Sequence, residues 1–123
     1  MGYRSDVAYV IQFDTIERKR EFVALRKLVP ETHKALSECK RVDDDSLYIT
    51  AEFENVKWYE GYDDVEMHMN MLRELDGDGE SGVEGVGAQF IRIGEEHDDT
   101  ETEYYGTIEV YALSVHRDIC MDV

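Results

Sequence analysis

Six carboxylates lie within nine residues in the last third of the sequence. They are Glu95, Glu96, Asp98, Asp99, Glu101 and Glu103. Carboxylates at this density gather counterions and attract cationic molecules, from metal ions to the basic surface of a protein. His97 lies among them, but no third ligand at a recognisable spacing accompanies it. We therefore expect the segment to be a loop between two paired strands whose acidic rim meets a basic partner, with no metal centre.

A glycine-rich segment, DGDGESGVEGVG, begins at Asp76 and first suggests calcium. Asp76, Asp78 and Glu80 take positions one, three and five of an EF-hand count. The count fails at position six, where the turn needs glycine and the chain has Ser81, and at position twelve, where Gly87 stands in place of the bidentate glutamate. The sequence favours a flexible acidic loop and leaves open whether it gathers a cation.

Spacings typical of catalysis are incomplete. His68 follows Asp64 by four residues, which places an imidazole and a carboxylate on one helix face and is half of a metal or acid–base site. Nucleophilic catalysis needs a cysteine or serine activated by a base, and Cys39 with His33 matches no known motif. The glycines match neither of two phosphate-binding motifs, the P-loop G-x-x-x-x-G-K-[ST] and the dinucleotide-binding G-x-G-x-x-G after a strand. We expect no enzyme and no cofactor, and a metal-assisted enzyme built from His68, His97 and nearby acids is the least favoured hypothesis.

Methionine and aromatic side chains supply candidate apolar contacts for a partner. Met67, Met69 and Met71 alternate within a predicted helix, so if Met69 is buried, Met67 and Met71 project elsewhere. Exposed methionines beside Trp58 and Tyr59 would form an adaptable contact patch. Alternatively, they fill gaps beneath the glycine-rich loop. The predicted partner-binding site thus joins these four residues, Trp58, Tyr59, Met67 and Met71, to the six carboxylates.

Hydrophobic periodicity predicts the elements that position these groups. Residues 6–13 are apolar on both faces and indicate an interior strand. Asp14 or Thr15 caps a helix, and Pro30 ends that helix or starts a second one. The remaining elements are a strand at 47–56, a helix from Asp63 or Asp64 to Leu75, and strands at 88–93 and 104–116 that read as a hairpin.

This order predicts the fold class and the domain organisation. Helices on one face of a small sheet cover the alternating apolar faces of its strands. We therefore predict an α+β, ferredoxin-like sandwich with two or three helices packed on one face of a mostly antiparallel four-stranded sheet. No linker or internal repeat is visible, so residues 1–123 form a single acidic domain.

Charge is divided unevenly along the chain. Residues 1–41 hold nine of the thirteen Lys and Arg against six acids, whereas residues 42–123 hold four basic residues against twenty-three acids. The net charge of −16 repels nucleic acids and acidic membranes and attracts basic proteins. The sequence contains no apolar run near 18 residues, and its two distant cysteines, Cys39 and Cys120, fit a reducing compartment.

Two short segments resemble a known group of proteins. The opening GYRSDVAYVI and the later FIRIGEEHDD are similar to segments of small uncharacterised proteins of bacteriophages and prophages. The resemblance implies a viral or prophage accessory protein in the cytoplasm of an infected or lysogenic bacterium. It implies no activity and no site residues.

Two principal hypotheses follow. The first is a phage-encoded acidic interaction protein that binds and modulates, by inhibition, a host protein with a basic surface, with imitation of nucleic-acid charge as one mode. The second is a small-ligand-binding or regulatory domain, because sandwiches of this kind often carry a pocket at a helix–sheet edge. A homodimer through the less acidic N-terminal part is compatible with both.

Overall fold

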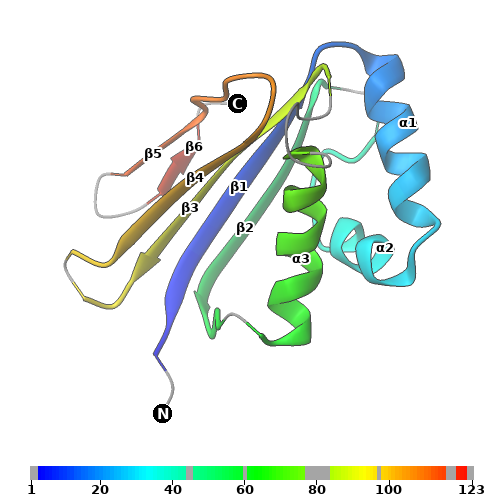
Figure 1. Cartoon of the computed structure of the whole chain (residues 1–123). Coiled ribbons are helices and arrows are strands. Elements are labelled where there is room, and N and C mark those ends of the chain that lie inside the picture. Colours follow the sequence, from blue (N-terminus) through cyan, green and yellow to red (C-terminus); the bar gives the residue numbers. More distant parts are fainter. Residues whose placement is uncertain are drawn as a thin grey trace.

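The computed structural model describes residues 3–43, 46–59, 61–76, 84–96, 98–115 and 119–121. Four antiparallel strands form the main sheet in the order β2-β1-β3-β4, and the α-helices lie on one side of it (Figure 1). The elements are β1 (Ser5–Phe13), α1 (Ile16–Lys27), α2 (Pro30–Ser37), β2 (Tyr48–Val56), α3 (Asp63–Arg73), the 3₁₀ turn η1 (Glu74–Asp76), β3 (Val86–Gly94), β4 (Thr100–Gly106), β5 (Leu113–Val115) and β6 (Ile119–Met121). The α+β prediction is confirmed, and the arrangement is consistent with a ferredoxin-like sandwich.

β1 lies between β2 and β3 because both of its faces are apolar. Tyr9 lies opposite Ala51 of β2 and Phe90 of β3, and its side chain packs into the core beneath the helices. Ala8 and Val10 point to the opposite face of the sheet and are equally buried. A strand that is apolar on both faces needs a covering layer on each side.

The second covering layer is the β5–β6 hairpin, which lies on the side of the sheet opposite the helices (Figure 1). Val110, Ala112 and Leu113 form a second apolar cluster there with Ala8, Val10 and Ile91, and Ile119 and Met121 pack against it. The prediction of one strand over residues 104–116 was wrong, because that stretch contains the end of β4, a crossing segment and β5.

Two glycines, Gly106 and Gly87, explain why β4 ends at residue 106. Gly106 closes β4 with a φ of +81°, a left-handed conformation that turns the chain out of the sheet. The following segment then crosses close to β3, where a Cβ on Gly87 would lie 1.9 Å from the carbonyl oxygen of Ile108. Alternation of apolar residues continues through this turn, so periodicity alone did not reveal it.

The helices begin where the sequence predicts, and of the three described α-helices only α1 has a side-chain N-cap. The side chain of Thr15 accepts a hydrogen bond of 3.1 Å from the backbone N–H of Arg18 and caps α1. Pro30 occupies the first turn of α2, which confirms the reading of two helices rather than one. α3 begins at Asp63 with three acids in its first turn, as the helix dipole favours.

Lys19 ties α1 to the chain entering β2. Its side chain is fully buried, and Nζ donates to the backbone carbonyls of Arg41, Ser46 and Tyr48 at 2.6, 2.7 and 2.9 Å. An ammonium buried in this way must have its donors satisfied, and three carbonyls converge on it for that purpose. Lys19 therefore acts as a polar clamp between α1 and β2 and not as a solvated helix residue.

Candidate functional site: an acidic–aromatic cleft

A cleft of about 250 Å³ opens on the helix-bearing face of the sheet, between the segment after β2 and the outermost strand β4. Its lining combines aromatic, apolar and charged side chains from segments far apart in the sequence. The lining residues are Tyr3, Trp58, Tyr59, Met69, Phe90, Arg92, Asp99, Glu101 and Glu103. We refer to this feature as the acidic–aromatic cleft.

Trp58 is held on the aromatic side of the cleft by neighbouring rings. It stacks on Phe53 of β2 with ring centroids 5.8 Å apart, and its centroid lies 6.1 Å from that of Phe90 on β3. It is partly buried against the main core, so its position is fixed while part of its surface lines the cleft. An indole held in this way can contact an apolar chain or a cation at the surface that lines the cleft.

The acidic side of the cleft is ordered by one arginine. Arg92 lies opposite Glu101 in the β3–β4 register and donates to it at 3.0 Å, while its two terminal nitrogens bond Asp99 at 2.7 and 3.2 Å. The Tyr3 hydroxyl donates to the same Asp99 carboxylate at 2.6 Å. These hydrogen bonds, the one from Arg92 first, lower the pKa of Asp99, so this carboxylate stays ionised.

Carboxylates outnumber cations around the cleft. Asp99, Glu101 and Glu103 contribute three negative charges, and Arg92 is the single cation among the lining residues. Glu103 accepts a hydrogen bond from the Tyr105 hydroxyl and is exposed, as is Glu101. The cleft can therefore bind a further cation that would meet two exposed carboxylates and an indole face.

The structure brings five of the ten predicted site residues together in this cleft: Trp58, Tyr59, Asp99, Glu101 and Glu103. The expectation that all six acids lie in a loop was wrong, because β4 begins at Thr100 and carries Glu101 and Glu103 as strand residues. Glu95, Glu96 and Asp98 lie in the exposed β3–β4 hairpin, outside the cleft lining. His97 falls outside the described residues.

Met67 and Met71 are not exposed, and this corrects the expected contact patch. Met67 and Met69 are each 5% exposed and Met71 is fully buried. α3 is covered from two directions, by the sheet and by α2, so more than one stripe of the helix is buried. Met69, which was expected only to fill the core, is the methionine that lines the cleft.

Sequence reasoning missed Tyr3, Phe90 and Arg92 as lining residues. Arg92 is a lone basic residue between Ile91 and Ile93 in an otherwise apolar strand, and period-two alternation places it on the same face as Phe90. A charge at such a position signals a cross-strand partner, which is the role that Glu101 takes.

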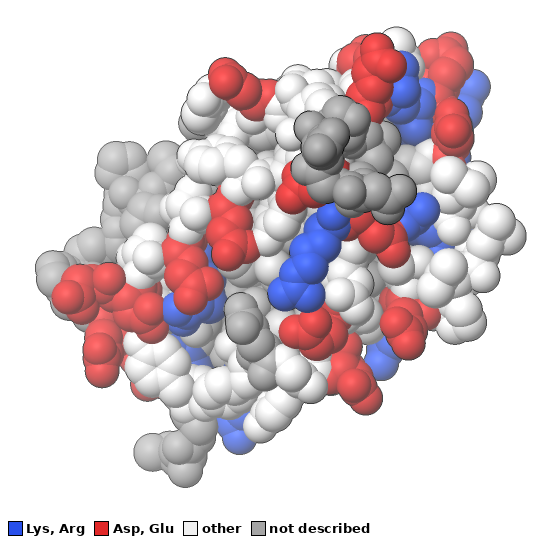
Figure 2. Space-filling view, viewed as in Figure 1, with Lys and Arg blue, Asp and Glu red and all other residues white. Residues whose placement is uncertain are grey.

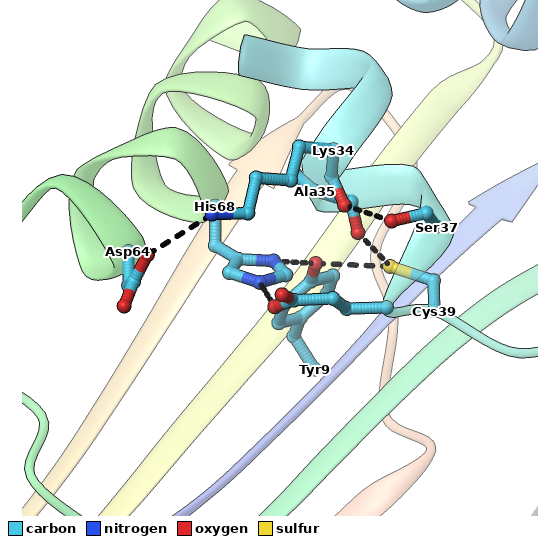
Figure 3. A network of polar contacts seen from close by, with 8 residues as sticks. Tyr9, Lys34, Ala35, Ser37, Cys39, Asp64 and His68 are labelled. Carbon is cyan, nitrogen blue, oxygen red and sulfur yellow. Dashed lines mark hydrogen bonds and ion pairs between the residues drawn. The ribbon is translucent and has the colours of Figure 1, made fainter.

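A separate polar network lies buried beneath α2 and α3 (Figure 3). His68 of α3 bonds Glu38 through Nε2 at 2.8 Å and Tyr9 of β1 through Nδ1 at 2.6 Å, and the Tyr9 hydroxyl lies 3.1 Å from Sγ of Cys39. A neutral imidazole donates from one nitrogen and accepts at the other, so with Nε2 donating to the Glu38 carboxylate, Nδ1 accepts a hydrogen bond from the Tyr9 hydroxyl. The i,i+4 spacing of Asp64 and His68 forms no shared site among the described contacts, because His68 bonds Glu38 and Tyr9 while the Asp64 carboxylate bonds Lys34 at 3.4 Å.

This network keeps the Cys39 thiol, the Tyr9 phenol and the His68 imidazole neutral rather than activating them. Burial raises the pKa of the Cys39 thiol to about 11 and raises that of Tyr9 well above its ordinary value. Burial also lowers the pKa of His68, although Glu38 opposes this effect. A catalytic thiol needs the opposite environment, one that favours the thiolate. The network is therefore suited to holding β1, α2 and α3 together.

The acidic loop that the sequence favoured over a calcium site lies mostly outside the described residues. Asp78 and Glu80 fall outside them, whereas Asp76 is described. Oδ1 of Asp76 accepts the backbone N–H of Gly106 at 2.8 Å. Within the described ranges, no group of three or more His, Cys, Asp or Glu side chains is placed to hold a metal ion. None of the described helices has the length and apolar character needed to cross a bilayer.

Comparisons with known proteins give no assignment. No family model matches the chain, and no curated protein and no solved structure is similar to it. The cleft geometry and the charge pattern are therefore the basis for functional inference.

Proposed function

We propose that the protein is an interaction protein that binds a partner with a basic surface through the acidic–aromatic cleft. The observation that carries the proposal is the meeting of Trp58 and Tyr59 with Glu101 and Glu103 around one hollow. Acidic residues speed encounter with a cationic surface, and desolvated aromatic contacts supply the affinity that charges alone do not. The resemblance to phage and prophage proteins makes a bacterial host protein the partner that we propose, with inhibition of that protein as the effect.

The wider charge distribution supports steering more than imitation of a nucleic acid. Acidic side chains gather over β4 and the β3–β4 hairpin and again over α3, with uncharged surface and basic side chains between these groups (Figure 2). Around α1 the acids are interspersed with basic side chains (Figure 2). The proposal therefore rests on local recognition of cationic side chains at the cleft, reached by long-range attraction.

The single tryptophan of the chain makes the proposal directly testable. Because Trp58 lines the cleft, its fluorescence reports occupancy without a label. We expect hexalysine to change the fluorescence saturably, with an affinity that falls as salt is raised from about 20 to 200 mM. The double substitution Glu101→Gln with Glu103→Gln should weaken binding about tenfold, the equivalent of roughly 1.4 kcal/mol.

A matched control is available on the opposite edge of the sheet. Glu52 and Glu54 have the same spacing on β2 and are exposed, but they lie away from the cleft. The double substitution Glu52→Gln with Glu54→Gln removes the same charge and should change the affinity by less than about twofold. Equal losses in both double variants, or no response of Trp58 to hexalysine, would contradict the proposal.

Spermidine tests the alternative that the cleft binds a small cationic molecule instead of a basic segment of a protein. It carries amines in a flexible chain but has no peptide backbone and no neighbouring side chains. We expect spermidine to saturate the Trp58 response only at higher concentration than hexalysine, because fewer contacts form. Tighter binding of spermidine would assign the cleft to a small ligand, the second hypothesis.

A further inference from the structure

The outer edge of β4 is the second notable feature of this region. β4 is the last strand of the sheet order β2-β1-β3-β4, and in the part of the chain that the structure describes it pairs only with β3. Residues 100–104 are exposed. An unpaired strand edge presents backbone N–H and C=O groups that can pair with an added strand.

The backbone groups that point outward can be identified from the register. Gly106 lies opposite Gly87, yet its N–H bonds the carboxylate of Asp76 at 2.8 Å and so points away from β3. The direction of N–H and C=O groups alternates along an antiparallel strand. The N–H groups of Thr102 and Tyr104 therefore point outward as well. The outward N–H of Gly106, at the end of this edge, is already bonded to Asp76.

The opposite edge of the sheet is partly covered. Lys40 exchanges two backbone hydrogen bonds, of 2.7 and 3.0 Å, with Thr50 of β2, so this edge is paired at Thr50. β4 carries no comparable covering bridge within the described residues. The exposed β4 edge is thus the edge that lies beside the acidic–aromatic cleft.

The charges of Glu101 and Glu103 favour a cationic partner strand over a second copy of this chain at the β4 edge. Glu101 and Glu103 share the cleft-facing side of β4, whereas Thr102 and Tyr104 face the other side. If a second copy paired antiparallel about Thr102, Glu101 of each copy would lie opposite Glu103 of the other, and like charges opposite one another are destabilising. A partner strand with Lys or Arg at alternate positions would instead place its cations opposite both carboxylates.

We infer that a cationic, extended segment of the partner adds to β4 as a fifth strand. Its alternate Lys or Arg side chains enter the cleft beside Glu101, Glu103 and Trp58. The residues between them lie on the side of Tyr104, which is 54% exposed and accepts apolar or β-branched neighbours. This inference rests on the proposed function and adds the mode of binding and the sequence pattern of the partner.

The test uses the full chain and the hexapeptide Lys-Val-Lys-Val-Lys-Val, followed by Trp58 fluorescence. Thr102→Pro removes one outward N–H, and proline is tolerated at an edge strand where its nitrogen faces solvent. Thr102→Val retains that N–H and the strand propensity. We expect Thr102→Pro to weaken peptide binding about tenfold and Thr102→Val to change it by less than about twofold.

A modified peptide repeats the test without altering the protein. Methylation of the backbone nitrogens of the three valines keeps every charge but prevents the added strand, and we expect it to weaken binding about tenfold or more. Strand addition is overturned if the methylated peptide binds as well as the unmethylated one and Thr102→Pro binds the peptide as well as the unsubstituted protein. Cation binding in the cleft would still stand in that case. If no peptide changes Trp58 fluorescence, the proposed function itself fails.

The same series separates a partner strand from a second copy of the chain. We expect size-exclusion chromatography at about 20 and 200 mM salt to give the same oligomeric state for the unsubstituted protein and for Thr102→Pro. A dimer that is lost in Thr102→Pro, together with peptide binding that is unchanged in this variant, would assign the edge to self-association and overturn the inference.

Discussion

The buried network around His68 and the acidic–aromatic cleft contain similar side chains, but the first stabilises the fold and the second is proposed to bind another molecule. Both lie on the helix-bearing side of the sheet and both touch Trp58, whose ring centroid is 5.9 Å from that of His68. In the network each polar group meets a partner, and burial favours the neutral forms of Tyr9, Cys39 and His68. In the cleft the pKa of Asp99 is lowered, and three carboxylates face a single arginine. Groups satisfied internally stabilise the fold, whereas charges left in excess at an open edge are available to another molecule.

The sharpest test of the stabilising role of buried polar groups is Lys19→Met. Methionine retains the volume but leaves the carbonyls of Arg41, Ser46 and Tyr48 without their donor. We expect a loss of more than about 3 kcal/mol in the free energy of unfolding, measured by urea denaturation. Lys27→Met, on the exposed side of the same helix, should change it by less than about 0.5 kcal/mol. Similar values for both variants would show that the clamp contributes little.

Tyr9→Phe tests the network with a smaller perturbation. The substitution removes only the hydroxyl that joins His68 to Cys39 and leaves buried Nδ1 without a donor. We expect a destabilisation of about 1 to 3 kcal/mol, again from urea denaturation. Tyr104→Phe makes the same chemical change on an exposed ring and should have almost no effect. An equally small effect at Tyr9 would contradict the importance of the hydrogen bond.

The pH dependence of stability sharpens the comparison further. Because the pKa of folded His68 lies below 6.5, the unfolded chain binds more protons as pH falls below that value. The contribution of neutral His68 is therefore complete above pH 6.5 and is lost as pH falls through the folded pKa. The slope of this loss is at most about 1.4 kcal/mol per pH unit for one proton.

His68→Gln is the control for this pH effect, since the amide accepts from Tyr9 and donates to Glu38 but does not titrate. We expect the unfolding free energy of the variant to depend less on pH between 7.5 and 5.5 than that of the unsubstituted protein. Identical pH dependence in both proteins would show that His68 is not the group responsible.

The smallest effect on stability should come from the cleft. Glu101→Gln with Glu103→Gln removes exposed charges, and Arg92 keeps its hydrogen bonds to Asp99, so the unfolding free energy should change by less than about 0.5 kcal/mol. The same double variant is expected to lose most of its affinity for hexalysine. A large loss of stability would mean that these carboxylates serve the fold, and the contrast between the two regions would disappear.

Sequence reasoning was most successful where a local pattern decides the structure. The two apolar faces of residues 6–13, the cap at Thr15 and the helix start at Pro30 each follow from neighbouring residues, and all three are found. The α+β class followed from the order of these elements. The part of the site carried by Trp58, Tyr59, Glu101 and Glu103 was also named in advance, although its assembly into a cleft was not.

The remaining features depend on contacts between distant segments. Lys19 is buried only because three carbonyls from the chain before and within β2 converge on it, and no local period reports this. Met71 is buried because α3 packs on two sides, which a single helical stripe does not predict. The division of the C-terminal stretch into β4 and β5 depends on a glycine turn and on the second apolar face of β1.

The central place of β1 has a consequence for biosynthesis. This segment leaves the ribosome before both of its neighbours, and β3 begins only at Val86. At about 5 to 20 residues per second, the nascent chain spends roughly 4 to 15 seconds between completing β1 and starting β3. Throughout that interval the edge of β1 that pairs with β3 lacks its partner strand, whereas β2 is translated before the interval ends, so chaperone contact is expected to concentrate on residues 5–13.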